Sequence, residues 1–213
     1  NDDFLGVQWH YDPIALREAW DITTGYAATV VAIVDTGIVL DHPDLQGKLV
    51  QGYDFISDPA NALDGNGIDP DPDDPGDGAI NGRSSFHGTH VGGTVGAATD
   101  NGTGVAGAAW NVSLMPLRTL GARGGTSFDI LEAVRFAAGL PNSSGTVPAR
   151  PADVINLSLG GPSFSGTAQA VYQEARDQGA IIVAAAGNDA TSQPSYPAAY
   201  DGVVSVSAVA INN

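Results

Sequence analysis

The chain has 213 residues, enough for one sizeable hydrophobic core, and carries 24 acidic but only 8 basic residues, a formal net charge of −16. This acidity argues against nucleic acid and anionic membranes as partners, and no apolar run reaches the roughly 20 residues of a membrane-spanning helix. These residues include no cysteine, which excludes disulfide bonds and thiolate chemistry within them.

Apolar segments alternate with segments of helical periodicity along the chain. Asp12 followed by Pro13 predicts the start of a helix that ends near Trp20, because both residues favour a helix N-terminus. Further helices are expected at 87–98, 128–139 and 167–178, the last one ended by Gly179. The predicted strands are 28–34, 49–55, 113–118, 154–157, 181–185 and 203–207.

The predicted strands are apolar on both faces and are separated by helices, which favours a parallel sheet covered on both sides. The expected fold is therefore α/β, a three-layer sandwich with a mostly parallel central sheet. Ligands of such sheets bind outside the carboxyl ends of the strands. Asp35, Ser158 and Asn188 each follow such an end, so we expect the functional site there.

Residues 64–78, DGNGIDPDPDDPGDG, are too rich in glycine and proline for the interior of a helix or strand, so we expect a loop. Oxygen-bearing side chains crowd this loop: Asp64, Asn66, Asp69, Asp71, Asp74 and Asp77. Ca²⁺ takes about 6–8 oxygen ligands in flexible geometry, so the loop is a candidate calcium site. A solvated acidic surface loop is the alternative.

Asp35 and His87 are the candidate catalytic residues. Asp35 ends the apolar segment TVVAIV in a tight DTG turn, and His87 begins a small-residue helix in HGTHVGG. A serine hydroxyl is a weak nucleophile until an imidazole accepts its proton, and a carboxylate is needed to orient that imidazole. Asn188 follows another apolar strand in AAAGN, where its side-chain amide can donate to a developing oxyanion.

Two other interpretations of these motifs stay open. DTG also occurs in aspartic proteases, which need two copies, whereas this sequence has one. His87 and His90 could form a metal pair, but zinc would need a third ligand of suitable spacing. Without a metal, we expect His90 to be a buried histidine between the helix and the sheet.

Six segments together resemble the subtilase family of serine endopeptidases, and they cover nearly the whole chain: AIVDTGI, DHPDL, HGTHVGGTVGA, GVAGAA, VINLSLGG and AAAGN. The resemblance implies a subtilisin-like fold and the hydrolysis of peptide bonds in extended protein substrates. It also implies that Asp35 is the triad acid, that His87 is the general base and that Asn188 is the side-chain oxyanion donor.

The resemblance further implies where a protein or peptide substrate binds. Ser158, Leu159 and Gly160 match the strand that walls the pocket for the substrate residue before the scissile bond. Residues 120–125, LGARGG, are similar to the family's edge strand, which pairs with the substrate backbone. The substrate-binding residues expected in this segment are Leu120, Gly121, Gly124 and Gly125.

Calcium (Ca²⁺) is the cofactor that the resemblance implies. Asp44 in DHPDL matches the family's calcium-binding aspartate, and the loop 99–105 matches the stretch that supplies other ligands. The ligands expected from this loop are the side-chain oxygen of Asn101 and the carbonyls of Thr103 and Val105. The acidic insertion 64–78 is similar to one in some extracellular bacterial members and is a candidate for a second ion.

The family's nucleophile lies in a Gly-Thr-Ser segment that would fall beyond Asn213. Residues 125–127 also spell Gly-Thr-Ser, but they precede Asn188 and favour a helix N-cap instead. We therefore expect the N-terminal part of one subtilisin-like domain, 1–213, inactive alone. Either a C-terminal segment of the same enzyme completes it as a separate chain, or the sequence is a truncated part of the enzyme. A non-catalytic peptide-binding or regulatory fragment is the alternative. The N-terminal Asn1, in place of an initiator methionine, suggests processing and fits a secreted, extracellular enzyme.

Overall fold

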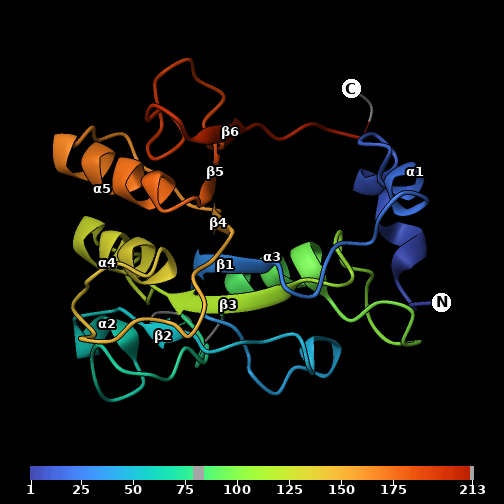
Figure 1. Cartoon of the computed structure of the whole chain (residues 1–213), viewed down its shortest axis with the longest axis horizontal. Helices are drawn as coiled ribbons and strands as arrows, with labels where there is room; N and C mark the ends of the chain where they lie inside the picture. Colours follow the sequence, from blue (N-terminus) through green and yellow to red (C-terminus); the bar gives the residue numbers. More distant parts are fainter. Residues whose placement is uncertain (79–83, 212–213) are drawn as a thin grey trace.

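The structure is a computed structural model that describes residues 1–78 and 84–211. Six strands of the described residues form one sheet, in the order β2-β3-β1-β4-β5-β6, and every neighbouring pair is parallel (Figure 1). The strands are β1 (Val30–Asp35), β2 (Tyr53–Asp54), β3 (Ser113–Arg118), β4 (Val154–Leu157), β5 (Ile181–Ala185) and β6 (Val204–Val206). The predicted α/β class and parallel sheet are confirmed.

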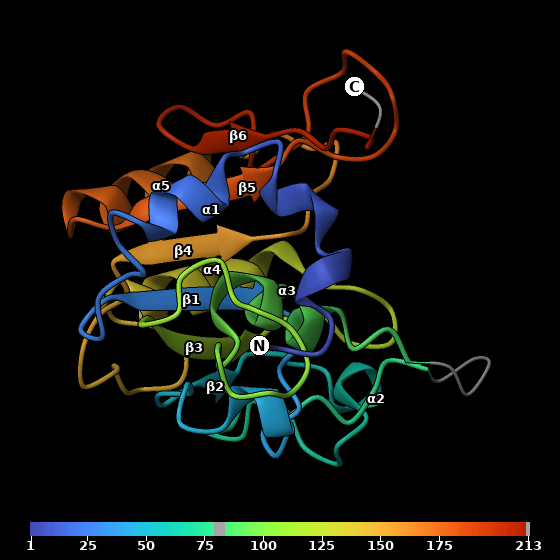
Figure 2. The same ribbon diagram turned by 90° about the vertical axis from the view of Figure 1, so that its right-hand side faces the viewer.

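Helices cover both faces of this sheet and make the three layers that the sequence predicts. α4 (Ser127–Ala137) and α5 (Gly166–Asp177) pack side by side on one face, and α3 (His87–Gly96) lies on the other (Figures 1 and 2). The shorter helices are α1 (Leu16–Trp20), α2 (Pro59–Ala62) and the 3₁₀ helices Leu5–Val7, Trp9–Tyr11 and Pro43–Leu45. None of the helices in the described ranges is long and apolar enough to cross a membrane.

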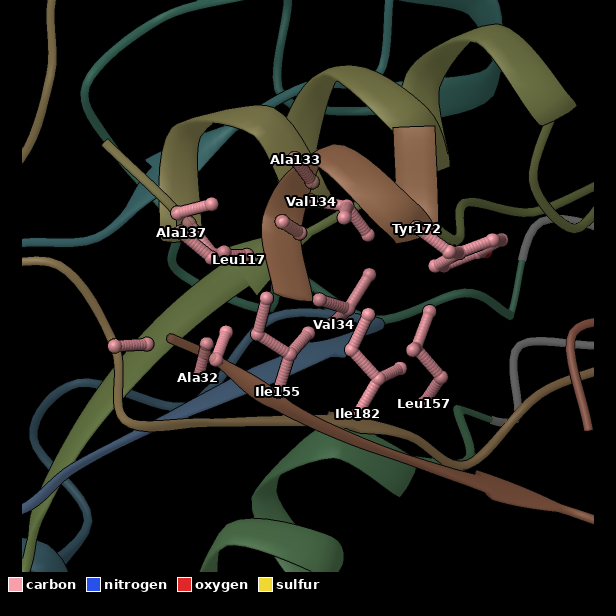
Figure 3. Packing of buried hydrophobic residues seen from close by; sticks show 14 of the residues in the cluster. Ala32, Val34, Leu117, Ala133, Val134, Ala137, Ile155, Leu157, Tyr172 and Ile182 are labelled. Carbon is pink, nitrogen blue, oxygen red and sulfur yellow. The ribbon is translucent and has the colours of Figure 1, made fainter. Parts of the chain in front are cut away.

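β1 is buried along its whole length because it packs against both helical layers. Val30, Ala32 and Val34 belong to the core cluster under α4 and α5. Val31 and Ile33, which point to the opposite face, belong to the cluster under α3. Figure 3 shows the larger cluster, in which aliphatic side chains of β3, β1, β4 and β5 meet the two helices.

α3 approaches the sheet closely because glycines line its inner face. A methyl group at Gly92 would come within 2.9 Å of Ile38 Cδ1, and one at Gly88 within 2.2 Å of the Gly37 carbonyl oxygen. This contact places the first residue of α3, His87, beside the carboxyl end of β1.

The predicted strand 49–55 is interrupted, and β2 covers only Tyr53–Asp54. Leu114 in β3 still exchanges hydrogen bonds with residues 48–50, at 2.8 and 2.9 Å. Two residues further along β3, Pro116 has no N–H to donate, so the ladder breaks there and resumes after it.

The first predicted helix begins later than expected. Asp12 ends a short 3₁₀ helix and Ala15 adopts a left-handed φ of 51°, so α1 starts only at Leu16. The ends of the other predicted helices agree within two residues. Thr126 and Ser165 cap α4 and α5, each accepting the backbone N–H three residues on, which confirms the expected N-cap in 125–127.

Candidate active site

Asp35 is the last residue of β1, and its side chain is completely buried. Its Oδ1 accepts the Thr36 backbone N–H at 2.8 Å and shares a 2.8 Å hydrogen bond with Nδ1 of His87. Its other oxygen, Oδ2, is buried without a hydrogen-bond partner among the described residues. The strand end therefore holds the carboxylate rigidly and presents one oxygen to the imidazole.

His87 is the first residue of α3, and about half of its side chain (47%) is exposed. The hydrogen bond to Asp35 raises the pKa of the ring, partial burial lowers it, and the negative charges of Asp35 and Asp77 raise it further. When Asp35 accepts from Nδ1–H, the neutral ring keeps its free lone pair on Nε2. The imidazole can therefore accept a proton at Nε2 while Asp35 holds its orientation.

Phe86, directly before His87, has a left-handed φ of 47°. Such a conformation costs an L-residue about 1–2 kcal/mol and persists only where the surroundings enforce it. Here it lets the chain turn sharply, so that the His87 N–H points to Ser85 Oγ at 3.3 Å. No sequence pattern indicated this strained residue.

A cleft of about 680 Å³ opens beside His87. It is lined by all the predicted substrate-binding residues: Leu120, Gly121, Gly124, Gly125, Ser158, Leu159 and Gly160. They lie in two segments that follow β3 and β4, on either side of β1 in the sheet. Three tyrosines not expected from the sequence also line it: Tyr172, Tyr196 and Tyr200. Their rings contact one another, with Tyr200 between the other two.

Residues 120–125 form a turn instead of the expected edge strand. Gly121 and Gly124 exchange backbone hydrogen bonds of 3.1 and 2.9 Å, which closes the segment on itself. Gly124 has a φ of 81°, a conformation that glycine adopts easily. The segment borders the cleft, and in this conformation the N–H and carbonyl groups of Gly121 and Gly124 pair with each other.

Asn188 lies in an exposed loop just after β5 and is not among the residues that line the cleft. The structure therefore brings Asp35 and His87 together, and the role expected of Asn188 stays a prediction. His90 is exposed on α3, so the expectation of a buried histidine is wrong. The reason is that glycines occupy the inner face of this helix.

The acidic loop does not gather its side chains around one point. Its Asp64 carboxylate pairs with Arg118, whereas the Asp77 carboxylate accepts from Ser85. Four of its residues accept the backbone N–H two positions later: Asp64, Asp69, Asp71 and Asp74. Such local turns explain the spacing of the aspartates.

The expected ligands of the acidic loop are thus held by separate contacts, and an ion bound by this loop stays a prediction. In the part of the chain that the structure describes, no three His, Cys, Asp or Glu side chains form a group that could hold a metal. The residues expected to share the ion point to separate partners or to solvent: Asp64, Asn66, Asp69, Asp71, Asp74 and Asp77.

Arg118 ends β3 beside Asp35 and is almost completely buried, with 1% exposed. Its guanidinium binds the carboxylates of Asp54 and Asp64 and the carbonyl of Ala62. Burial raises the pKa of Asp54 to about 7, although Arg118 and a backbone N–H act against this rise. Arg118 fastens the start of the acidic loop to the sheet, a role that the sequence did not indicate.

Asp44, the expected calcium ligand, is 2% exposed. Its carboxylate accepts the side-chain amide of Asn101 at 3.0 Å and the N–H of Val105 at 2.9 Å. Gly104 lies so close that a Cβ there would be 2.2 Å from Asp44 Oδ2. The predicted ligand loop therefore wraps around Asp44, while Thr103 is exposed and donates its N–H to Asn101 Oδ1.

Asp2, which the sequence did not indicate, is also buried at this loop. Its two carboxylate oxygens accept the backbone N–H groups of Asp100 and Asn101, each at 3.0 Å. The chain thus places two carboxylates and an amide side chain at one loop, all of them oxygen donors of the kind that Ca²⁺ prefers.

Known proteases resemble this chain over nearly its whole length. Residues 27–213 match the subtilase family. The chain is 44% identical to an extracellular protease of Xanthomonas campestris, over 98% of the chain and 38% of that protein. It is 35% identical to thermitase of Thermoactinomyces vulgaris, over 99% of the chain and 65% of that protein. A solved structure described as proteases from Pseudoalteromonas arctica PAMC 21717 superposes with a TM-score of 0.92 at 43% identity, covering 100% of this chain and 66% of that one.

Proposed function

The chain belongs to the subtilase family, and from this premise we propose that it supplies the acid and the base of an Asp–His–Ser triad in a serine endopeptidase. The strongest support for this proposal is the geometry of the Asp35–His87 pair. The buried Asp35 and the half-exposed His87 share a 2.8 Å hydrogen bond at the edge of a cleft. Acid, base and substrate groove are the parts that acyl transfer by a serine requires before the nucleophile is added.

In this proposal Asp35 keeps the imidazole oriented, with the proton on Nδ1. As the serine oxygen attacks the scissile carbonyl, Nε2 of His87 accepts the proton of the serine hydroxyl. The imidazolium then donates that proton to the leaving amine. The buried carboxylate stabilises the imidazolium between these two steps. Asn188 is assigned to the developing oxyanion on the strength of the AAAGN motif alone.

The serine nucleophile is proposed to come from a Gly-Thr-Ser segment outside these 213 residues, either continuous with the chain or bound to it as a separate chain. Ser127 is unsuited to the role because it is the first residue of α4, where the preceding Thr126 caps the helix. The 213 residues alone are therefore expected to bind substrate without cleaving it.

The proposed substrate is an extended segment of a protein, bound in the cleft between residues 120–125 and 158–160. Pairing with 120–125 would require the turn closed by Gly121 and Gly124 to open. Three of the relatives are named extracellular proteases, and on that ground we propose that the whole protein is secreted.

Calcium is proposed to bind at Asp44 and the loop 99–105. The donor set fits a hard cation, because Asp2, Asp44 and Asn101 offer carboxylate and amide oxygens there. Bound calcium would supply charge compensation for the two buried carboxylates and no chemistry in the reaction. Its expected effect is to fasten the N-terminal segment to the loop.

Replacement of each histidine of HGTH tests the proposed function, with the polypeptide that carries these residues together with the nucleophile segment. His87→Gln should abolish hydrolysis of a peptide anilide, whereas His90→Gln, on the exposed side of the same helix, should leave it unchanged. Hydrolysis that survives His87→Gln would contradict the proposal. A protein that binds peptides without cleaving them would favour a binding or regulatory fragment.

A further inference from the structure

A set of hydrogen bonds joins the residues that follow Asp35 and His87, and its central residue, Thr36, also lines the cleft. Thr36, the residue after Asp35, is only 5% exposed, and its Oγ1 donates a 2.6 Å hydrogen bond to Oδ2 of Asp74. The same oxygen accepts a 3.0 Å hydrogen bond from the backbone N–H of Gly88, the residue after His87. One hydroxyl therefore joins the turn that carries the acid to the helix that carries the base.

Asp74 is itself fixed by its surroundings and is 5% exposed. Its Oδ1 accepts the Gly76 N–H at 2.8 Å, and its own N–H donates to the Ile38 carbonyl at 3.3 Å. The Ile38 N–H donates in turn to Pro72, so this part of the acidic loop runs along the residues that follow Asp35. Both carboxylate oxygens of Asp74 are thus used within the protein.

The polarity of these hydrogen bonds gives Asp74 a defined role. A carboxylate accepts hydrogen bonds and donates none, so Asp74 requires the Thr36 hydroxyl to donate towards it. The lone pairs of that hydroxyl are then left for the Gly88 N–H, one of the N–H groups at the start of α3 that have no partner within the helix. A donor group in place of the Asp74 carboxylate would disturb both hydrogen bonds of the Thr36 hydroxyl, the one to residue 74 and the one from the Gly88 N–H.

We propose that Asp74 is a positioning residue of the triad, which sets the geometry of Asp35 and His87 through the hydroxyl of Thr36. The inference rests on the proposed function, because it concerns the working geometry of the same site. The hydrogen bonds of Asp74 go to Thr36, Gly76 and Ile38 and not to the imidazole, and the residue belongs to the loop for which the sequence suggested calcium.

Substitutions of Thr36 and Asp74, made in the polypeptide that includes the nucleophile, distinguish a role in positioning the triad from a role in folding stability alone. Asp74→Asn and Thr36→Val should each lower kcat about tenfold and leave KM within about twofold, since small misplacements of catalytic groups act on the chemical step. Thr36→Ser keeps the hydroxyl and should restore most of the activity. Asp73→Asn is the matched control, because it removes the same charge one residue away. Its bond to the Leu40 N–H can be kept by the amide oxygen of asparagine.

The titration of His87, followed by NMR of its ring, gives a second readout that needs no activity. Thr36→Val changes no charge, yet it should shift the ring titration and the acidic limb of the rate profile to lower pH, because a looser Asp35 hydrogen bond stabilises the imidazolium less. If Asp74 acts through Thr36, adding Asp74→Asn to Thr36→Val should produce little further change.

The outcomes separate this inference from the proposed function. A wild-type protein that hydrolyses no peptide would refute the proposed function, and the His87 titration would still test the positioning. Unchanged kcat and ring titration in Asp74→Asn and Thr36→Val would overturn the inference, as would an equal loss in Asp73→Asn. Fully additive effects of the two substitutions would show that Asp74 acts through space by its charge and would also overturn it.

Discussion

The carboxylate of Asp35 is completely buried, whereas the ring of His87, which shares a 2.8 Å hydrogen bond with it, is about half exposed. The pair spans the boundary between the core and the cleft. Burial keeps water from competing for the acid, and exposure lets the base exchange protons with a bound substrate. The end of β1 and the start of α3 are both required to produce this arrangement.

Asp35→Asn tests the acid directly. An amide cannot hold the imidazole in the same tautomer, so kcat of the protein that includes the nucleophile should fall by about 10⁴, the order known for such a change in serine proteases. The pKa of His87 should fall towards its ordinary value, because the raising hydrogen bond is lost. Steady-state kinetics and ring NMR provide the measurements. Asp41→Asn, at an exposed neighbouring aspartate, should change neither quantity.

Protonation of His87 should stabilise the folded chain, so this part of the stability should decrease as the pH rises. The pKa of His87 in the folded state lies above the ordinary value of 6.5. The stabilisation that protonated His87 gives to the folded state is therefore fully present below pH 6.5, and it is lost as the pH rises through the raised pKa. The difference in Tm between the chain and its His87→Gln variant should therefore be larger at about pH 5 than at about pH 9. A difference that grows with pH would contradict this assignment.

Arg118→Met should destabilise the fold strongly. Removing the guanidinium leaves Asp54 and Asp64 without their cation, and breaking such a buried pair typically costs about 3–5 kcal/mol. Arg123→Met is the control, since its ion pair with Asp58 is exposed and is expected to contribute less than about 1 kcal/mol. Denaturant unfolding measures both values. Equal losses for the two variants would show that Arg118 does not organise the loop.

Gly88→Ala should disturb the contact between α3 and the DTG turn. The added methyl group would lie 2.2 Å from the Gly37 carbonyl oxygen, and overpacking of this kind typically costs about 1–3 kcal/mol. Gly93→Ala on the same helix meets no atom within 4 Å and should stabilise the chain by about 0.5–1 kcal/mol through helix propensity. Thermal unfolding distinguishes the two. A neutral Gly88→Ala would refute the close approach.

Removal of calcium should lower Tm if the ion binds at Asp44. A ligand present at 100 times its Kd stabilises a fold by about 2.7 kcal/mol, and a chelator abolishes this contribution. Asp44→Ala should eliminate the response of Tm to calcium, whereas Asp69→Ala in the acidic loop should preserve it. The reverse pattern would place the ion in the acidic loop and contradict the proposed site.

The parts of the site that could be predicted from the sequence are those set by local pattern. Asp35 ends a strand and His87 begins a helix, and both elements have clear periodicity in the sequence. The rule that sites form at the carboxyl ends of parallel strands was therefore sufficient to predict that the two residues meet. The turn at 120–125 and the break of the strand at Pro116 depend on backbone geometry that periodicity does not report.

The aspartates of the acidic loop show why the remainder could not be predicted. Composition indicates many oxygen donors but not their directions, and directions decide between one shared ion and separate partners. Arg118, sixty-four residues from Asp54 in sequence, becomes that partner only through the pairing of β2 with β3. Asp74 likewise meets Thr36, 38 residues away in sequence, only in the folded chain.

Intact mass after treatment with a serine-directed phosphonyl fluoride tests the central claim most directly. In the polypeptide that carries these residues with the nucleophile segment, we expect one adduct per molecule, located on the serine of that segment. The adduct should be lost in His87→Gln and kept in His90→Gln, and the 213 residues alone should carry none. Labelling that does not depend on His87, or an adduct on the 213 residues themselves, would contradict the account.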